Sequence, residues 1–133
     1  MRLLWRIEHG LQRKSKQMDA SLGITGPQRL VLKIADQFPG LSAGELAHIV
    51  RLHPSTITGV LQRLVDKGLL ARTHDKGDRR RVRLEVKHAA RKFVRQSPGT
   101  IEAAVADVLS RASAPSVKKT RDVLAAVADA LEK

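Results

Sequence analysis

The fold is decided by residues 42–81, which read SAGELAHIVRLHPSTITGVLQRLVDKGLLARTHDKGDRRR. Ser42 followed three residues later by Glu45 forms a capping box, in which each side chain satisfies a free N–H group at the start of a helix. This spacing predicts a short helix with three inward-facing residues: Leu46, Ile49 and Val50. A connection of three residues, 51–53, then leads to a second helix.

Pro54 suits the first turn of this second helix, because a proline has no N–H group to be satisfied there. The helix is expected to run to Lys67 and to be closed by Gly68. On a 3.6-residue wheel, three apolar residues cluster within about 60° and mark the buried side: Ile57, Leu61 and Leu64. Two helices joined by so short a turn form a helix-turn-helix.

The sequence period changes after these helices. Residues 69–73 are strand-like, and residues 75–78 are the usual formers of a tight turn. Residues 82–86 alternate apolar and charged side chains, as a strand with one buried face does. A basic hairpin therefore follows the helix-turn-helix.

Helical patterns extend on both sides of this block. Residues 2–20 are expected to form an amphipathic helix that ends at Gly23, and Thr25 with Gln28 forms a second capping box. The helix that starts there is expected to run through Leu30, Val31 and Ile34 and to end at Pro39-Gly40. Beyond Lys87 the pattern is helical, with breaks at 97–99 and 113–115 and two Ala-rich helices at about 100–112 and 116–132.

The chain has 133 residues and a formal net charge of +12, which is unevenly placed. Residues 69–95 carry 10 basic and 3 acidic side chains, whereas residues 96–133 carry 5 of each. A focused positive charge usually faces a polyanion. RNA readers usually offer stacking aromatics, and the three aromatic residues lie outside the expected contact face: Trp5, Phe38 and Phe93. DNA is therefore favoured.

Several other classes of protein find no support. With no Cys, the chain forms no disulfide, thiolate zinc site or iron–sulfur cluster. The five histidines are scattered, which favours surface or capping roles over a metal site, and His53 before Pro54 suits an N-terminal cap or a phosphate contact. No phosphate loop or hydrolase motif indicates an enzyme or a cofactor. No stretch approaches the ~18 apolar residues of a membrane span, so a cytoplasmic domain is expected.

The outward side of the second helix carries the residues expected to read DNA in the major groove: Ser55, Thr56, Thr58, Gly59, Gln62 and Arg63. Gln62 can make paired hydrogen bonds to adenine, and Arg63 can bind guanine or phosphate. Gly59 costs roughly 1 kcal/mol relative to Ala inside a helix, which a close approach to a sugar–phosphate edge would explain. For this helix alone, an ordinary exposed amphipathic helix is the alternative.

Three arginines, Arg79, Arg80 and Arg81, directly follow the turn of the hairpin. A narrow minor groove concentrates negative potential and attracts such side chains. Asp78 is expected to be their local ion-pair partner. Helix and hairpin together make a winged helix with both DNA-contacting parts in sequence order.

The ordered motifs resemble those of the multiple-antibiotic-resistance regulator (MarR) family. The matching stretches are LGITGPQ at 22–28, LSAGELA at 41–47, PSTIT at 54–58, LVDKGLL at 64–70 and DKGDRR at 75–80. The resemblance implies a mainly α fold with a small β-hairpin, in which a winged helix-turn-helix at 23–97 is flanked by helical dimerisation regions at 1–22 and 98–133. Where the family has Leu-Thr and then Gly after the second wing strand, this chain has Val86-Lys87 and Ala90, so the next helix is expected to be capped differently.

The resemblance also implies a homodimeric transcriptional repressor. Apolar residues of the terminal helices favour a second copy as their cover: Leu3, Leu4, Trp5, Ile7, Leu11, Val117, Val123, Leu124, Val127 and Leu131. A twofold dimer should bind a pseudo-palindrome with half-sites roughly 10 bp apart. Related regulators respond to small aromatic acids, and Trp5 and His9 lie near the region concerned. The alternative is a sequence-tolerant architectural DNA-binding protein without a ligand.

Overall fold

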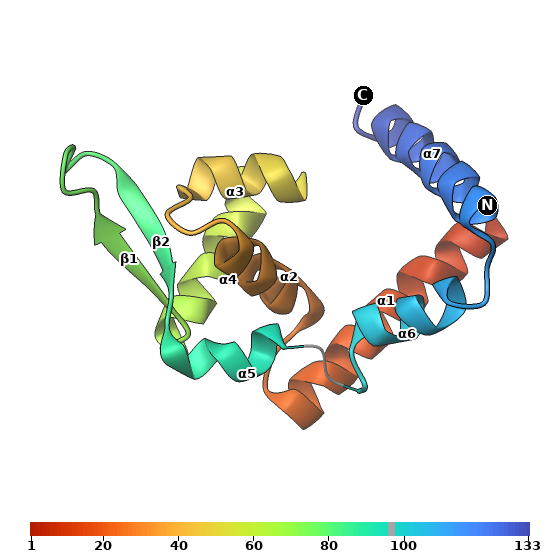
Figure 1. Ribbon diagram of the computed structural model, residues 1–133, viewed down its shortest axis with the longest axis horizontal. Helices are drawn as coiled ribbons and strands as arrows, with labels where there is room; N and C mark the ends of the chain where they lie inside the picture. Colours follow the sequence, from red (N-terminus) through yellow and green to blue (C-terminus); the bar gives the residue numbers. More distant parts are fainter. Residues whose placement is uncertain (96–97) are drawn as a thin grey trace.

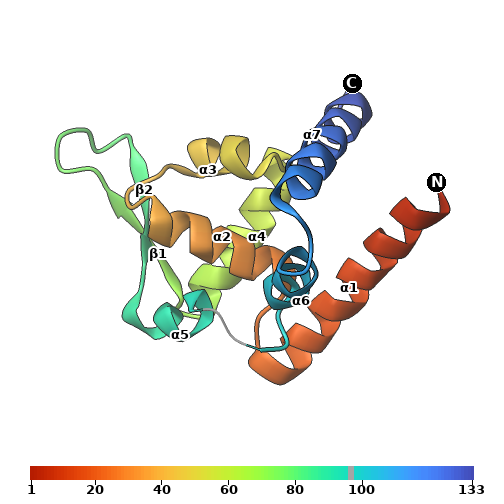
Figure 2. The same cartoon turned by 45° about the vertical axis from the view of Figure 1, so that its right-hand side comes forward.

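The computed structural model describes residues 1–95 and 98–133. Within them the chain is mainly helical, with one antiparallel hairpin, as expected. The hairpin lies at one end of the molecule, and the N-terminal and C-terminal helices lie at the other (Figures 1 and 2). These terminal helices are α1 (Arg2–Leu22), α6 (Ile101–Leu109) and α7 (Ala114–Leu131).

Three helices form the helix-turn-helix unit: α2 (Gly26–Gln37), α3 (Ala43–Val50) and α4 (Pro54–Asp66). Both predicted capping boxes are confirmed. The hydroxyl of Thr25 accepts from the N–H of Gln28 at 3.3 Å, and the hydroxyl of Ser42 accepts from the N–H of Glu45 at 3.2 Å. The turn after α3 closes at Arg51, whose φ of 50° is the left-handed conformation that ends a helix.

The hairpin consists of β1 (Leu70–His74) and β2 (Val82–Val86), in the register that places Arg72 opposite Leu84. The N–H of Leu84 also donates to the carbonyl of Leu41 at 2.8 Å. The segment just before α3 therefore adds a main-chain contact to β2. This contact fixes the wing to the helix-turn-helix unit.

One hydrophobic core holds this unit together. The predicted inner side of α4 is confirmed, since Ile57, Leu61 and Leu64 are all buried. They pack in a cluster with buried residues of the neighbouring elements: Ile24, Val31, Leu32, Leu46, Leu70, Leu84 and Ala90. Burial of each large aliphatic side chain stabilises the fold by about 1.5–3 kcal/mol. The core thus fixes α4 with its other side outward.

The structure also shows which sides of α2 and α3 are buried. In α2, Leu30 is 42% exposed, while Gln28, Arg29 and Val31 are buried. This helix contacts α1, α3, α4, α5 and β2, so several of its sides are covered. In α3, Leu46 is buried as expected, but Ile49 is 43% exposed, because the side of the helix that enters the core passes through Leu46 and Ala47.

The flanking elements correct several predicted boundaries. Gly23 ends α1 with a φ of 73°, as expected. Residue 112 lies beyond α6, and α7 begins before residue 116, because Ser113 caps it and Pro115 fits its first turn. Between β2 and α6 lie η1 (His88–Ala90) and α5 (Arg91–Val94), which start without a side-chain cap among the described residues. Within the predicted break at 97–99, Pro98 and Gly99 form a turn, in which Gly99 has a φ of 84°. Residue 97, where a domain boundary was also predicted, lies outside the described residues.

Candidate nucleic-acid interface

The outer side of α4 is a continuous polar face. All the residues expected to read DNA are exposed on it: Ser55, Thr56, Thr58, Gly59, Gln62 and Arg63. The opposite side is buried, with Val60 joining the three predicted residues. The core therefore presents these side chains together along one helix, as the wheel predicted.

The start of α4 is held by His53. Its Nδ1 accepts from the N–H of Ser55 at 3.3 Å and lies 2.7 Å from the hydroxyl of Ser55. The capping role expected for His53 is confirmed. The hydroxyl of Thr58 donates to the carbonyl of Pro54 at 2.9 Å. Hydroxyls and free N–H groups at a helix N-terminus form a ready site for phosphate oxygens.

Two features of the middle of α4 bear on base reading. The amide nitrogen of Gln62 donates to the Asp66 carboxylate at 2.8 Å, one turn further along the helix. A base edge that binds Gln62 must therefore compete with this exposed hydrogen bond. A Cβ placed on Gly59 would meet no atom within 4 Å. No packing within the chain therefore requires a glycine there.

The wing is shaped by a carboxylate that sequence reasoning did not single out. Asp75 forms an ion pair with Arg83 of β2 and accepts from the N–H of Gly77 at 2.7 Å. The N–H of Gly77 and the Arg83 guanidinium lower the pKa of Asp75 below its ordinary value. Asp78, the expected ion-pair partner, instead accepts from the N–H of Arg80 at 3.0 Å. A short Asp side chain is readily satisfied by a backbone N–H two residues on.

The three wing arginines are all exposed, but they differ in their surroundings. Arg81 lies beside α3, where it lines a shallow hollow with Glu45 and Arg83. Hydrogen bonds from Ser42 lower the pKa of Glu45, and the charges of Arg81 and Arg83 act in the same direction. Arg79 and Arg80 follow the turn itself, and the carbonyl of Arg79 lies 2.9 Å from Nδ1 of His74.

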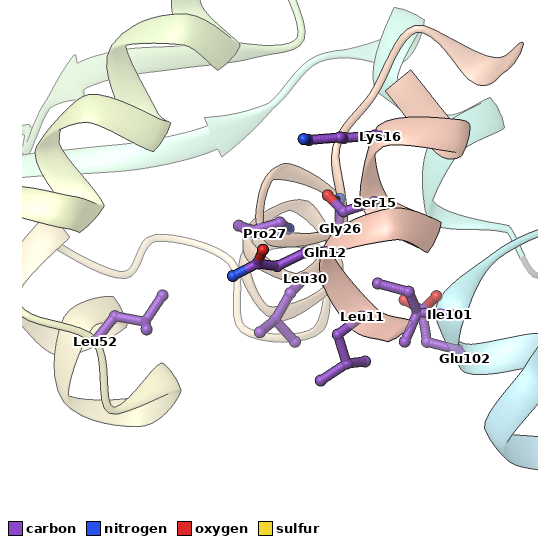
Figure 3. Close-up of a pocket in the computed structure, with 10 residues that line it drawn as sticks. All are labelled: Leu11, Gln12, Ser15, Lys16, Gly26, Pro27, Leu30, Leu52, Ile101 and Glu102. Atoms are coloured by element: carbon purple, nitrogen blue, oxygen red, sulfur yellow. Dashed lines mark hydrogen bonds between the residues drawn. The ribbon is translucent and has the colours of Figure 1, made fainter. Parts of the chain in front are cut away.

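A cavity of about 580 Å³ lies among α1, α2 and the start of α6 (Figure 3). Its lining is mainly apolar, with a few polar side chains: Leu11, Gln12, Ser15, Lys16, Gly26, Pro27, Leu30, Leu52, Ile101 and Glu102. Trp5 and His9, which the resemblance placed near the effector region, instead line a separate depression on α1. They lie in the first turns of α1, whereas the cavity is lined by later residues of that helix, from Leu11 to Lys16.

A buried arginine that pairs with Glu102 of the cavity lining also escaped sequence reasoning. The Arg29 side chain is 1% exposed, and its Nε donates to both carboxylate oxygens of Glu102 at 3.1 and 3.2 Å. Its terminal nitrogens donate to the carbonyls of Phe93 and of Arg95, the latter at 2.9 Å. A buried charge needs such partners, and removing one of them typically costs about 3–5 kcal/mol. No sequence signal marked the residue, because its partners are 64 to 73 positions away.

Known proteins resemble this chain in sequence and in fold. Residues 24–82 match the model of the MarR family. Over 122 residues, 92% of this chain and 88% of the relative, the sequence is 30% identical to the HTH-type transcriptional repressor Rv2887 of Mycobacterium tuberculosis H37Rv. The chain belongs to the MarR family.

Solved structures of MarR regulators agree with the fold. The PcaV transcriptional regulator from Streptomyces coelicolor, solved with its natural ligand, is 28% identical, with a TM-score of 0.78 over 97% of this chain and 91% of PcaV. The S. aureus MepR–DNA complex, 22% identical, has a TM-score of 0.81 over 97% of this chain and 95% of MepR and supports the fold alone. The expected winged helix with flanking helices is confirmed.

Family membership also settles the general activity. The protein is a MarR-family transcriptional repressor, a DNA-binding regulator rather than an enzyme. Across residues 1–95 and 98–133, no helix is long and apolar enough to cross a membrane. Within the same ranges, no group of His, Asp and Glu side chains could hold a metal ion.

Proposed function

We propose that the protein is a homodimeric repressor that binds a pseudo-palindromic operator in a sequence-specific manner. The observation that carries the proposal is the exposed polar face of α4, which the buried residues of the same helix hold outward. In this proposal residues 23–97 form the DNA-binding domain, and residues 1–22 and 98–133 form the dimerisation region. Binding of the operator would block access to a promoter.

The proposed role of α4 is to lie in the major groove. Gln62 would make paired hydrogen bonds to an adenine and Arg63 would bind guanine or phosphate, while Ser55 and Thr56 at the N-terminus would bind phosphate. Thr58 and Gly59 complete the surface that approaches the groove. The exposure of all these residues supports the assignment.

The proposed role of the wing is to place Arg79, Arg80 and Arg81 at the minor groove. Their exposure supports this role, and so does the attachment of β2 to the segment before α3. A narrow groove would attract the guanidinium groups without reading individual bases. The wing would then add affinity, and α4 would add sequence preference.

Dimerisation is supported by apolar side chains that this chain leaves uncovered at the terminal helices: Leu3, Leu4, Trp5, Ile7, Leu11, Val105, Val108, Leu109, Val123, Leu124 and Leu131. Exposed apolar side chains in such number on the terminal helices are typical of an interaction site. A twofold axis through it would set the two copies of α4 about 34 Å apart, one turn of duplex DNA.

The cavity at the start of α6 is the proposed site for a small-molecule effector that releases the DNA. Its apolar walls suit an aromatic body, and the Lys16 ammonium at its edge suits a carboxylate (Figure 3). An aromatic acid is therefore the proposed class. The related regulator PcaV was solved with its natural ligand, which is in keeping with a ligand-responsive fold.

The test is selection of bound DNA from a random duplex library at two salt concentrations, followed by sequencing. An inverted repeat with half-sites about one helical turn apart is the expected result. Retention of DNA without any motif, lost steeply as salt rises, would instead establish the sequence-tolerant architectural protein.

A further inference from the structure

The contact between Arg29 and Glu102 joins two parts of the molecule. Arg29 belongs to α2 of the helix-turn-helix unit, and Glu102 lies in the first turn of α6. The same guanidinium also binds the carbonyls at the end of α5. One buried side chain thus holds the last residues of the winged helix and the first turn of the C-terminal helices together.

A second contact lies beside the first, between Gly26 of α2 and Ile101, the residue before Glu102. A Cβ placed on Gly26 would come within 2.7 Å of Cδ1 of Ile101, so the glycine lets α6 approach α2 closely. The N–H of Gly26 donates to the hydroxyl of Ser15 in α1 at 2.8 Å. Helices α1, α2 and α6 therefore meet at the first turn of α2. Arg29, in the same turn of α2, makes the buried polar contact there.

Other ion pairs between the same parts of the chain are exposed. Arg51 lies 2.6 Å from Asp129 of α7 and 3.7 Å from Glu132 at the end of that helix. Lys67 lies 3.7 Å from Asp19 of α1. Exposed pairs contribute little, because water screens them and the long side chains lose entropy. Among the described residues, Arg29–Glu102 is the ion pair between these two parts that has a fully buried member, and we call this contact the joint.

We propose that the Arg29–Glu102 pair sets the orientation of the DNA-binding unit relative to the dimerisation helices, and thereby the half-site spacing that the dimer accepts. The inference rests on the proposed dimeric function. In a twofold dimer the two α4 helices are positioned through the dimerisation helices, and in each copy the Arg29–Glu102 contact is a buried polar link between those helices and the DNA-binding unit. One added base pair moves a half-site about 3.4 Å along the duplex and turns it by roughly a tenth of a turn. A dimer whose DNA-binding units are held rigidly binds half-sites poorly at the changed spacing, whereas a dimer with mobile units binds both spacings.

The variant that tests the joint is Glu102→Gln, which keeps the shape of the side chain and removes its charge. Asp107→Asn is the matched control, because Asp107 lies on the same helix and pairs with Arg111 of that helix. Each full-length protein is measured against duplexes whose two selected half-sites are separated by one base pair more or fewer, and against an isolated half-site. Helical circular dichroism monitors folding, and Glu102→Asp replaces Glu102→Gln if the latter does not fold.

The wild type and Asp107→Asn are expected to prefer one spacing. In Glu102→Gln the preference for that spacing over its neighbours should fall about fivefold or more, at the lower end of typical coupling between sites, while affinity for the isolated half-site stays the same. Unchanged spacing preference in a folded Glu102 variant overturns the inference, and so does an equal loss on the isolated half-site. Absence of any spacing preference in the wild type overturns the proposed dimeric function itself.

Discussion

Gly59 lies in the middle of α4, where a glycine is unfavourable and where no atom of the chain would obstruct a larger residue. The residue is exposed, and its neighbours on the same face are the polar side chains proposed to bind DNA. Packing within the chain does not require a glycine at this position. In the proposed complex, close approach of the DNA backbone would explain it.

Gly59→Ala should therefore separate stability from function. The added methyl group should raise the free energy of unfolding by about 1 kcal/mol, because alanine favours the helix and meets no clash. Affinity for the operator should fall, because the methyl group enters the space of the DNA. Thermal unfolding and operator binding measure the two effects. Higher stability with unchanged affinity would remove Gly59 from the interface.

Gln62→Ala tests base reading. The expected cost is about 1–3 kcal/mol of binding free energy on the operator, with relaxed preference at one base pair, because a paired contact to adenine is lost. Selection of bound DNA with the variant measures the preference, and Lys118→Ala, an exposed position on α7, is the control. An equal loss on every sequence would show that Gln62 does not read a base.

The wing is an element whose shape depends on few contacts. One ion pair, Asp75 with Arg83, crosses from its turn to β2, and one main-chain hydrogen bond ties β2 to Leu41. Arg79 and Arg80 lie between these fixed points and are exposed. The element therefore presents positive charge on a short, supported loop.

Arg80→Ala should weaken binding to all duplexes by a similar factor. The slope of the logarithm of affinity against the logarithm of salt concentration should become shallower by about one for each lost phosphate contact. Titrations at several salt concentrations measure this slope. Lys118→Ala, an exposed position on α7, is the matched control. The wing assignment fails if both variants change the slope equally.

Acid should loosen the wing through Asp75. Because its pKa is lowered in the folded chain, the ionised carboxylate stabilises the fold at pH values above the ordinary value of 3.8, and that contribution is lost as the pH falls further. The difference in stability between the wild type and Asp75→Asn should thus be constant near neutral pH and shrink in acid. Urea unfolding at a series of pH values measures it. A difference that grows below pH 3.8 would contradict the assignment.

At the size of the whole molecule, the dominant feature is the apolar surface left open on α1, α6 and α7. The hairpin and these helices lie at opposite ends of the molecule (Figure 1). A dimer formed through the helices would leave both wings free. The cavity lies between the two ends, and Glu102 contributes to both the cavity and the joint.

Ile7→Glu should disrupt the dimer and leave the DNA-binding unit folded. Ile7 is 46% exposed on α1, far from the core of the winged helix. Loss of its burial in both copies should cost about 3–6 kcal/mol of dimerisation free energy. Sedimentation should show a monomer that keeps affinity for a half-site and loses tight binding to the full operator. A variant that remains dimeric would place the interface elsewhere.

The sequence by itself determined the parts of this protein that depend on neighbours in the chain. Capping boxes, the proline of α4, the turn glycines and the alternation of β2 act over a few residues, so the order of helices and the hairpin could be predicted. The outer side of α4 followed from its period, because that helix has one buried side.

Only the tertiary structure decided the features that depend on distant partners. Several elements surround α2, so Arg29 is buried on that helix while its neighbour Leu30 is 42% exposed. The pairing of Arg29 with Glu102 and of Asp75 with Arg83, and the cavity at the start of α6, arise where separate segments meet. Local rules constrain a segment and its nearest turns, whereas charge pairing and cavities depend on how the assembled elements pack.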